Sequence, residues 1–177
     1  MSQPINISVT MDADAFRDFS SFDLFRHRRA WQRPLTFTVI LLVFAGVCLS
    51  QIGKLEGAAL LTVVLSVVAL GLPAVYFYTY FHNLTLQVKK MGLKDPKPFY
   101  RLQLDDDGLA VWMAGEQDKA EPSRRCDWHH IHLAYRTQNA IYIYVQQTQA
   151  YLWNSSLDAA WALLQEKLPA DRLRDFR

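Results

Sequence analysis

Residues 35–52, LTFTVILLVFAGVCLSQI, and residues 58–81, AALLTVVLSVVALGLPAVYFYTYF, decide the architecture of this chain of 177 residues. Neither stretch contains a charged residue. A helix of about 20 residues crosses a hydrocarbon layer roughly 30 Å thick, so both stretches are long enough, the first with a few flanking residues. Two buried helices of a soluble protein would show a polar stripe, which these lack. We therefore predict a transmembrane helical hairpin over residues 35–81.

The basic residues around the hairpin predict its orientation. Arg26, Arg28, Arg29 and Arg33 precede the first helix, and Lys89, Lys90, Lys94 and Lys97 follow the second. Lys54 is the only basic residue of the connecting loop. Because positive residues collect on the cytoplasmic side of a membrane, both termini are expected in the cytoplasm. We expect permanent spans rather than a cleaved signal peptide, because 34 residues precede the first stretch and the chain opens with the acidic and apolar MSQPINISVTMDADAF rather than with a basic region.

Two short regions flank the hairpin. In residues 1–34, INISVTM (5–11) alternates apolar and polar side chains and predicts a strand. A short helix with a phenylalanine face follows, which suits either the membrane surface or a soluble domain. Residues 82–98 are expected to continue the second helix into the cytoplasm as a juxtamembrane linker, until Pro96 and Pro98 break it.

Residues 99–177 have the pattern of a small cytoplasmic β domain. Short apolar segments recur every 8–12 residues between polar turns, which is typical of an antiparallel barrel or sandwich. Asp107-Gly108 predicts a tight hairpin turn. The helix predicted at 157–168 has one apolar face and is expected to close an open end of the sheet. We also expect the strand at 5–11 to join this sheet. The transmembrane hairpin and this antiparallel β domain with its closing helix together predict a membrane α+β fold.

The order of these features resembles the YcxB-like family of bacterial membrane proteins. The resemblance rests on the DDG turn (106–108), a W-x-x-I step at Trp128 and Ile131, the apolar strand 141–145 and the terminal amphipathic helix. It covers nearly the whole chain, although similar sequences place a proline where Asn154 precedes the last helix. The resemblance implies a pleckstrin-homology-like (PH-like) domain in a bacterial inner membrane protein, and it implies no established activity.

CDWHHIH, residues 126–132, is the one stretch in which metal ligands crowd together. In an extended strand, His130, His132 and Cys126 would share one face and form a metal- or thiol-dependent site. Zinc sites take three or four ligands, usually with a second cluster elsewhere in the chain, and no CxxC or HExxH is present. We therefore favour a core strand and predict no catalytic residue, no cofactor and no metal. The expected fold anchors are Asp107, Gly108, Trp128, Ile131 and Trp161.

Three functions remain open. The favoured one is a non-enzymatic membrane protein whose cytoplasmic domain mediates protein interaction or regulation. Its expected partners are the lipid bilayer and either another protein or further copies of itself. A net charge of +2 without a basic face argues against nucleic acid. The alternatives are the site at Cys126, His130 and His132, and a small transport-complex subunit with a pore lined by Thr36, Thr62 and Ser66 of several copies.

Overall fold

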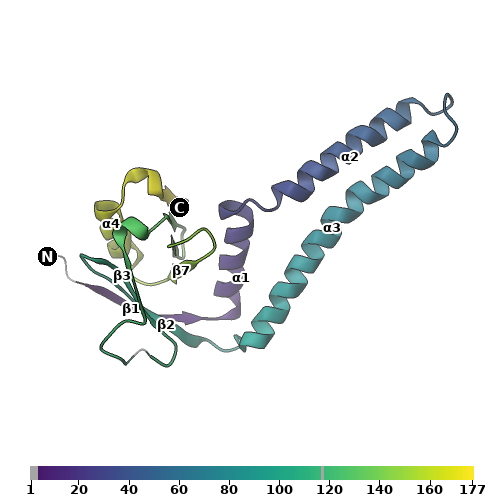
Figure 1. Cartoon of the computed structure of the whole chain (residues 1–177). Helices are drawn as coiled ribbons and strands as arrows, with labels where there is room; N and C mark the ends of the chain where they lie inside the picture. Colours follow the sequence, from purple (N-terminus) through teal and green to yellow (C-terminus); the bar gives the residue numbers. More distant parts are fainter. Residues whose placement is uncertain (1–3, 117) are drawn as a thin grey trace. The chain divides into compact units, whose positions relative to one another are not determined.

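The computed structural model describes residues 4–116 and 118–177, and the chain divides into two compact units. The β unit joins the N-terminal residues up to Ala13 to Asp95–Arg177, and the helical unit is Asp14–Lys94 (Figure 1). Since the β unit is discontinuous in sequence, the helical unit is an insertion within it.

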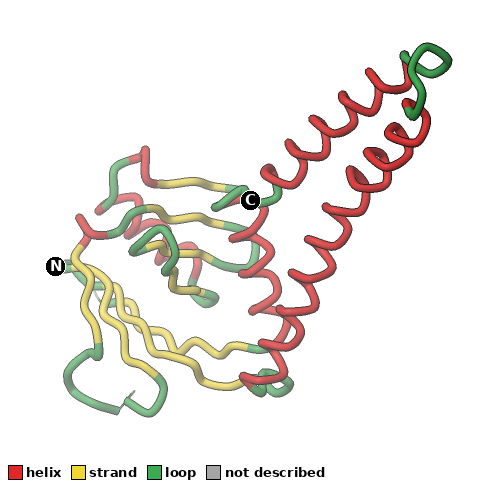
Figure 2. Tube along the Cα trace, turned by 45° about the vertical axis from the view of Figure 1, so that its right-hand side comes forward, coloured by secondary structure: helices red, strands yellow, loops and turns green. Residues whose placement is uncertain are grey.

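The β unit contains two four-stranded sheets (Figure 2). Neighbouring strands are antiparallel except for one parallel pair, β5 with β8. The predicted antiparallel domain is confirmed at this level, whereas β8 was not predicted. In sheet order, the first sheet is β1 (Ile5–Met11), β2 (Lys97–Leu104), β3 (Gly108–Met113) and β4 (Arg124–Asp127), and the second is β7 (Ala150–Trp153), β6 (Ile141–Tyr144), β5 (Leu133–Arg136) and β8 (Leu173–Asp175).

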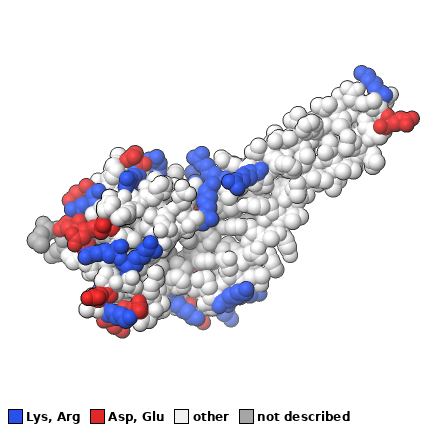
Figure 3. Space-filling view, viewed as in Figure 1, with Lys and Arg blue, Asp and Glu red and all other residues white. Residues whose placement is uncertain are grey.

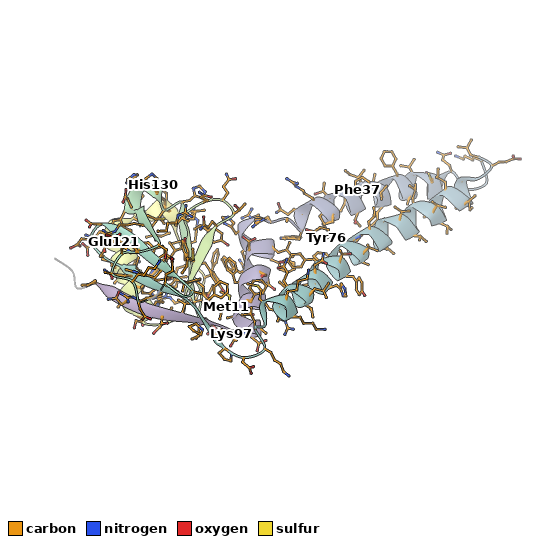
Figure 4. The ribbon with its side chains drawn as sticks, turned by 60° about the horizontal axis from the view of Figure 1, so that its bottom comes forward. Met11, Phe37, Tyr76, Lys97, Glu121 and His130 are labelled. Carbon is orange, nitrogen blue, oxygen red and sulfur yellow. The ribbon has the colours of Figure 1, made fainter. Side chains whose placement is uncertain are left out.

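Strand β1 pairs with β2 along its whole length, which confirms that the N-terminal strand joins the sheet of the C-terminal region. Ile5 lies opposite Leu104, and Met11 lies opposite Lys97. Met11 and Lys97 are labelled close together in Figure 4. Of the apolar side chains in the alternation of β1, Ile7, Val9 and Met11 are buried and Ile5 is half-buried, whereas the polar ones between them are exposed. The register shifts once, between Val9 and Thr10. These two strands are therefore paired side by side, although about 85 residues, which include the helical unit, separate them in sequence.

The two sheets are joined by a buried tyrosine. The Tyr100 hydroxyl on β2 accepts a hydrogen bond from the Leu152 amide of β7 at 2.7 Å and donates one to the Leu152 carbonyl at 3.3 Å. Burial raises the pKa of Tyr100, so the phenol stays protonated and keeps both bonds. The largest fully buried side chains of the β unit include Trp153, Leu102 and Ile143.

Helix α4 (Leu157–Lys167) connects to both sheets. Asp158 in its first turn forms an ion pair with Arg136 of β5, and Lys167 at its last turn lies 3.0 Å from Asp106 in the β2–β3 turn. Trp161 and Leu164 of the predicted apolar face are buried. Contacts at both of its ends thus place α4 across the two sheets, as expected for a helix that closes them. Ser156 occupies the N-cap position without a side-chain hydrogen bond to the helix.

The helical unit begins with α1 (Ala13–Phe22) and the π-helical turn η1 (Asp23–His27), which precede α2 (Gln32–Ser50) and α3 (Ala58–Met91). The Tyr80 hydroxyl of α3 donates to the Ser20 carbonyl of α1 at 2.8 Å, and the rings of Phe25 and Phe77 stack 6.2 Å apart. The phenylalanine-rich segment formed by α1 and η1 therefore contacts the C-terminal half of α3.

Helices α2 and α3 are long and apolar enough to cross a membrane, judged by length and composition. Most of their large apolar side chains are exposed; Leu60 is 70% exposed, for example. Figure 3 shows charged side chains at the loop that joins the helices and an uncharged surface along them. Helix α3 continues ten residues beyond the predicted span end at Phe81 and ends at Met91, where Gly92 adopts a left-handed conformation.

A threonine compensates for the proline inside α3. Pro73 has no amide hydrogen, so the carbonyl of Ala69, four residues earlier, loses its helical partner. The Thr38 hydroxyl of α2 lies 3.0 Å from this carbonyl and 3.0 Å from the Pro34 carbonyl of its own helix. Because a buried carbonyl without a partner costs free energy, the Thr38 hydroxyl both satisfies the buried Ala69 carbonyl and joins α2 to α3.

Candidate functional site

The histidine-rich sequence is not one extended strand, which is the arrangement that would place Cys126, His130 and His132 on the same face. Strand β4 ends at Asp127, and Trp128–His130 form the 3-10 turn η2 before β5 begins at Leu133. In a 3-10 turn the side chains three residues apart lie one above the other. His130 is therefore on the same side as Asp127, whereas a strand would have placed them on opposite faces.

This turn brings three ligand-type side chains together. Asp127 Oδ2 lies 3.7 Å from His130 Nδ1 and 3.9 Å from His129 Nε2, and the two imidazole centroids are 3.9 Å apart. Within residues 4–116 and 118–177, this is the one group of three such residues whose ligand atoms lie close enough to hold a metal ion, all within 4.8 Å of one another. All three side chains are exposed.

Side chains and backbone groups from distant elements hold the turn in place. The Trp128 indole donates to the Asp106 carbonyl at 2.9 Å. The Arg172 guanidinium donates to the carbonyls of His129 at 3.1 Å and Ile131 at 3.0 Å. The His132 amide donates to the Tyr144 carbonyl at 2.7 Å. The backbone of η2 is therefore fixed on both sides.

The predicted trio of Cys126, His130 and His132 is only partly assembled. Cys126 and His130 both line a surface hollow of about 260 Å³ between β4 and the β6–β7 turn, whereas His132 is not among its lining residues. Cys126 is buried, and His132 is exposed. Asp127 and His129, neither of which belongs to that trio, are the members of the group that sequence reasoning missed. No sequence pattern in residues 128–130 predicts a 3-10 turn more strongly than a strand, so the turn η2 was not expected.

The two arginines of the hollow are already engaged with protein groups. Arg124 Nη1 donates to the Gln149 side-chain oxygen at 2.8 Å. Arg125 pairs with Asp105 and lies 3.7 Å from Asp107. Desolvation, the largest effect, raises the pKa of Tyr151, the phenol next to Gln149, although nearby Arg124 lowers it. Of the two arginines of the hollow, one is thus bound to a neutral amide and the other to carboxylates.

The five expected fold anchors lie in the β2–β3 turn, in β3, in or next to η2, and in α4. The surroundings of Trp128 and Asp107 differ from the simple core and turn roles. Ile131 and Trp161 are buried as expected, whereas Trp128 is only half-buried and contributes through its indole hydrogen bond. In the DDG turn, the Asp105 carboxylate accepts hydrogen bonds from the amides of Asp107 and Gly108, each at 3.0 Å. Asp105 thus organises the turn through a local side-chain-to-backbone motif, and Asp107 is one of the residues held.

Gly108 is required by the close approach of two strands. A β-carbon at this position would lie 2.2 Å from the Cys126 carbonyl oxygen, and the backbone has a φ of +151°. No other residue type fits without movement of β4. The glycine therefore positions the strand that leads into η2.

Comparisons of the chain with protein-family models, with curated proteins and with solved structures gave no match. The fold and site described above therefore carry the functional argument without the help of a known relative.

Proposed function

We propose that this protein is a non-enzymatic, membrane-anchored module that binds a protein partner or regulates a neighbouring protein. In this proposal α2 and α3 cross a bacterial inner membrane as a hairpin, with the loop around Lys54 on the outside and both termini in the cytoplasm. The β unit is then a cytoplasmic domain. The exposed, uncharged sides of α2 and α3 and the basic residues at their other ends support this arrangement.

The order of strands supports a PH-like domain. Four antiparallel strands form the first sheet, three consecutive antiparallel strands (β5 to β7) form most of the second, and α4 follows directly. The extra strand β8 lies beside β5, at the end of the second sheet. The proposed membership of the YcxB-like family implies the same architecture, with the hairpin as an insertion.

The observation that carries the proposal is the insertion of the helical unit between the paired strands β1 and β2. A domain attached by one flexible linker would need a single connection. Here two connections leave neighbouring strands, between Met11 and α1 and between α3 and Lys97, so the first sheet is tied to both ends of the hairpin. Such a double connection suits a module that holds a bound partner at the membrane or responds to it.

A binding role agrees with the state of the polar groups on the β unit. Both arginines of the hollow are engaged with protein groups, Arg124 with the side-chain amide of Gln149 and Arg125 with the carboxylate of Asp105. Cys126 is buried beside them. These groups support the local structure, and the proposed partner is recognised by the surface of the domain. The pore lined by Thr36, Thr62 and Ser66 gains no support, because these three hydroxyls bond to carbonyls of their own helices. The site at Cys126, His130 and His132 gains none either, because Cys126 is buried and the exposed His132 does not line the hollow that Cys126 and His130 share.

The proposal is tested by native mass spectrometry of the untagged, full-length protein extracted gently from its own membranes. Photo-cross-linking residues placed at the exposed positions Met113 and Glu121 of the β unit add the location of any partner, with Lys54 in the hairpin loop as the matched control. We expect a co-purifying protein or a defined homo-oligomer, and cross-links from the β unit but not from Lys54. A monomer without cross-links from any position contradicts the proposal.

A further inference from the structure

We propose that Asp127, His129 and His130 form a binding site for one divalent transition-metal ion on the η2 turn. This inference is independent of the proposed function, since it concerns an ion and not a protein partner. It also concerns a different set of side chains from the Cys126, His130 and His132 trio that the sequence pattern suggested.

The distances between the ligand atoms suit a metal ion. A tetrahedral ion with ligands at about 2.0–2.1 Å needs its ligand atoms about 3.3 Å apart. The Asp127 carboxylate oxygen lies 3.7 Å from His130 Nδ1 and 3.9 Å from His129 Nε2. These two separations exceed the ideal one by about 0.4 and 0.6 Å, and all ligand atoms of the group lie within 4.8 Å of one another, so side-chain rotation is needed to close the site around an ion. The three side chains are 53–70% exposed, so their rotation disturbs no packing.

The backbone that presents these side chains is held in advance. Arg172 bonds the carbonyls of His129 and Ile131, and Trp128 bonds the Asp106 carbonyl from the centre of the turn. Ile131, which directly follows the turn, is fully buried. Binding an ion thus requires the ordering of three exposed side chains but not of the backbone, which lowers the entropic cost of binding.

The donor atoms predict which ions bind. Two imidazole nitrogens and one carboxylate oxygen favour Zn²⁺, Ni²⁺ or Cu²⁺, whereas Ca²⁺ and Mg²⁺ prefer sites built from oxygen alone. The carboxylate offsets one of the two positive charges of the ion. Three protein ligands leave at least one coordination position for water or for a ligand from another molecule. Arg125, the nearby cation on β4, is paired with Asp105 and does not occupy Asp127.

The test is a Zn²⁺ titration of the full-length protein in lipid nanodiscs by isothermal calorimetry, with the protein purified without a histidine tag and stripped with a chelator. His129→Ala and His130→Ala remove predicted ligands, and His132→Ala is the matched control because His132 is an exposed histidine outside the group. Loss of even an outer-shell partner weakens metal sites by about 10–100-fold, so each ligand variant is expected to lose at least that much affinity. Ca²⁺ is the ion control.

The expected result is one Zn²⁺ per chain in the unchanged protein and in His132→Ala, with binding at least tenfold weaker in His129→Ala and His130→Ala. Unchanged near-ultraviolet circular dichroism of the variants shows that they remain folded. The absence of stoichiometric Zn²⁺, or equal binding in all four proteins, overturns the proposal. It is also overturned if both His132→Ala and a separate Cys126→Ala variant lose binding, because these residues lie outside the proposed group. Equal affinity for Ca²⁺ and Zn²⁺ also contradicts the donor set.

Discussion

The hydrogen bond from Thr38 to the Ala69 carbonyl explains how the structure tolerates Pro73 inside α3. Pro73 would leave that carbonyl without a partner inside an apolar helix, and the hydroxyl from the neighbouring helix supplies one. A threonine hydroxyl in a helix can bond the carbonyl four residues earlier, and the bond to Pro34 is of this local kind. The second bond depends on how α2 and α3 face each other, which no local pattern contains.

At this residue scale, we expect Thr38→Val to weaken the hairpin by about 1–2 kcal/mol, in the range of hydrogen bonds between helices in membranes. The double variant with Pro73→Ala should recover most of this loss, because an alanine amide at position 73 bonds the Ala69 carbonyl. Thermal unfolding of the protein in nanodiscs measures both effects. Thr36→Val is the control, since Thr36 bonds only the Gln32 carbonyl one turn away in the hydrogen bonds described. Additive effects of the two substitutions would contradict the compensation.

Helix α4 illustrates what was predictable for an element and what was not. Its length and apolar face follow from the spacing of Trp161, Leu164 and Leu168, which are buried. Its attachment points do not, because the pairs of Asp158 with Arg136 and of Lys167 with Asp106 join residues far apart in sequence. The same limit applies to β8, whose three residues LRD are too short and polar to predict a strand. That strand forms because a parallel neighbour, β5, supplies its backbone partners.

The ion pair of Asp158 predicts a specific response to acid. A hydrogen bond from Arg136 holds the pKa of the Asp158 carboxyl below its usual value near 3.8. A carboxyl with a lowered pKa in the folded state contributes stability above its unfolded pKa and loses it as the pH falls through the folded value. We therefore expect α4 to lose this support below about pH 4.

Unfolding temperatures measured from pH 7 to pH 3 check this expectation. Asp158→Asn should lower the unfolding temperature at pH 7, because it leaves the buried Arg136 side chain without its anionic partner. The difference from the unchanged protein should shrink as the pH approaches 3. Glu121→Gln, a change at an exposed loop position, provides the control for general acid effects. A difference that stays constant over the whole range would contradict the role assigned to this ion pair.

At the scale of the whole molecule, the insertion of the helical unit is the main feature. The long uncharged stretches made the hairpin predictable, because a hydrocarbon environment excludes charged side chains. The pairing of β1 with β2 was expected from the shared side of the hairpin ends, and the structure confirms it. The site was less predictable, because the change from β4 to the η2 turn exchanges the faces on which the histidines lie.

The β unit should fold without its insertion. Met11 and Lys97 lie opposite each other at the ends of β1 and β2, so a turn of two to four residues can replace residues 12–96. We expect this shortened chain to be soluble and monomeric, with a cooperative unfolding transition and dispersed amide resonances. Deletion of β1 from the shortened chain is the matched control and should abolish folding, because it removes the buried side chains of Ile7, Val9 and Met11. A shortened chain that aggregates or stays unfolded would contradict the insertion.

The most direct test of the account is the side of the membrane on which each region lies. Single cysteines are introduced by Asn6→Cys, Lys54→Cys or Glu121→Cys into a chain whose Cys48 and Cys126 are replaced by alanine. A membrane-impermeant maleimide is then added to bacterial spheroplasts before and after permeabilisation. The account predicts that position 54 reacts in intact spheroplasts and that positions 6 and 121 react only after permeabilisation. A protected loop at position 54, or labelling of position 6 or 121 from outside, would contradict the cytoplasmic β unit and the membrane hairpin.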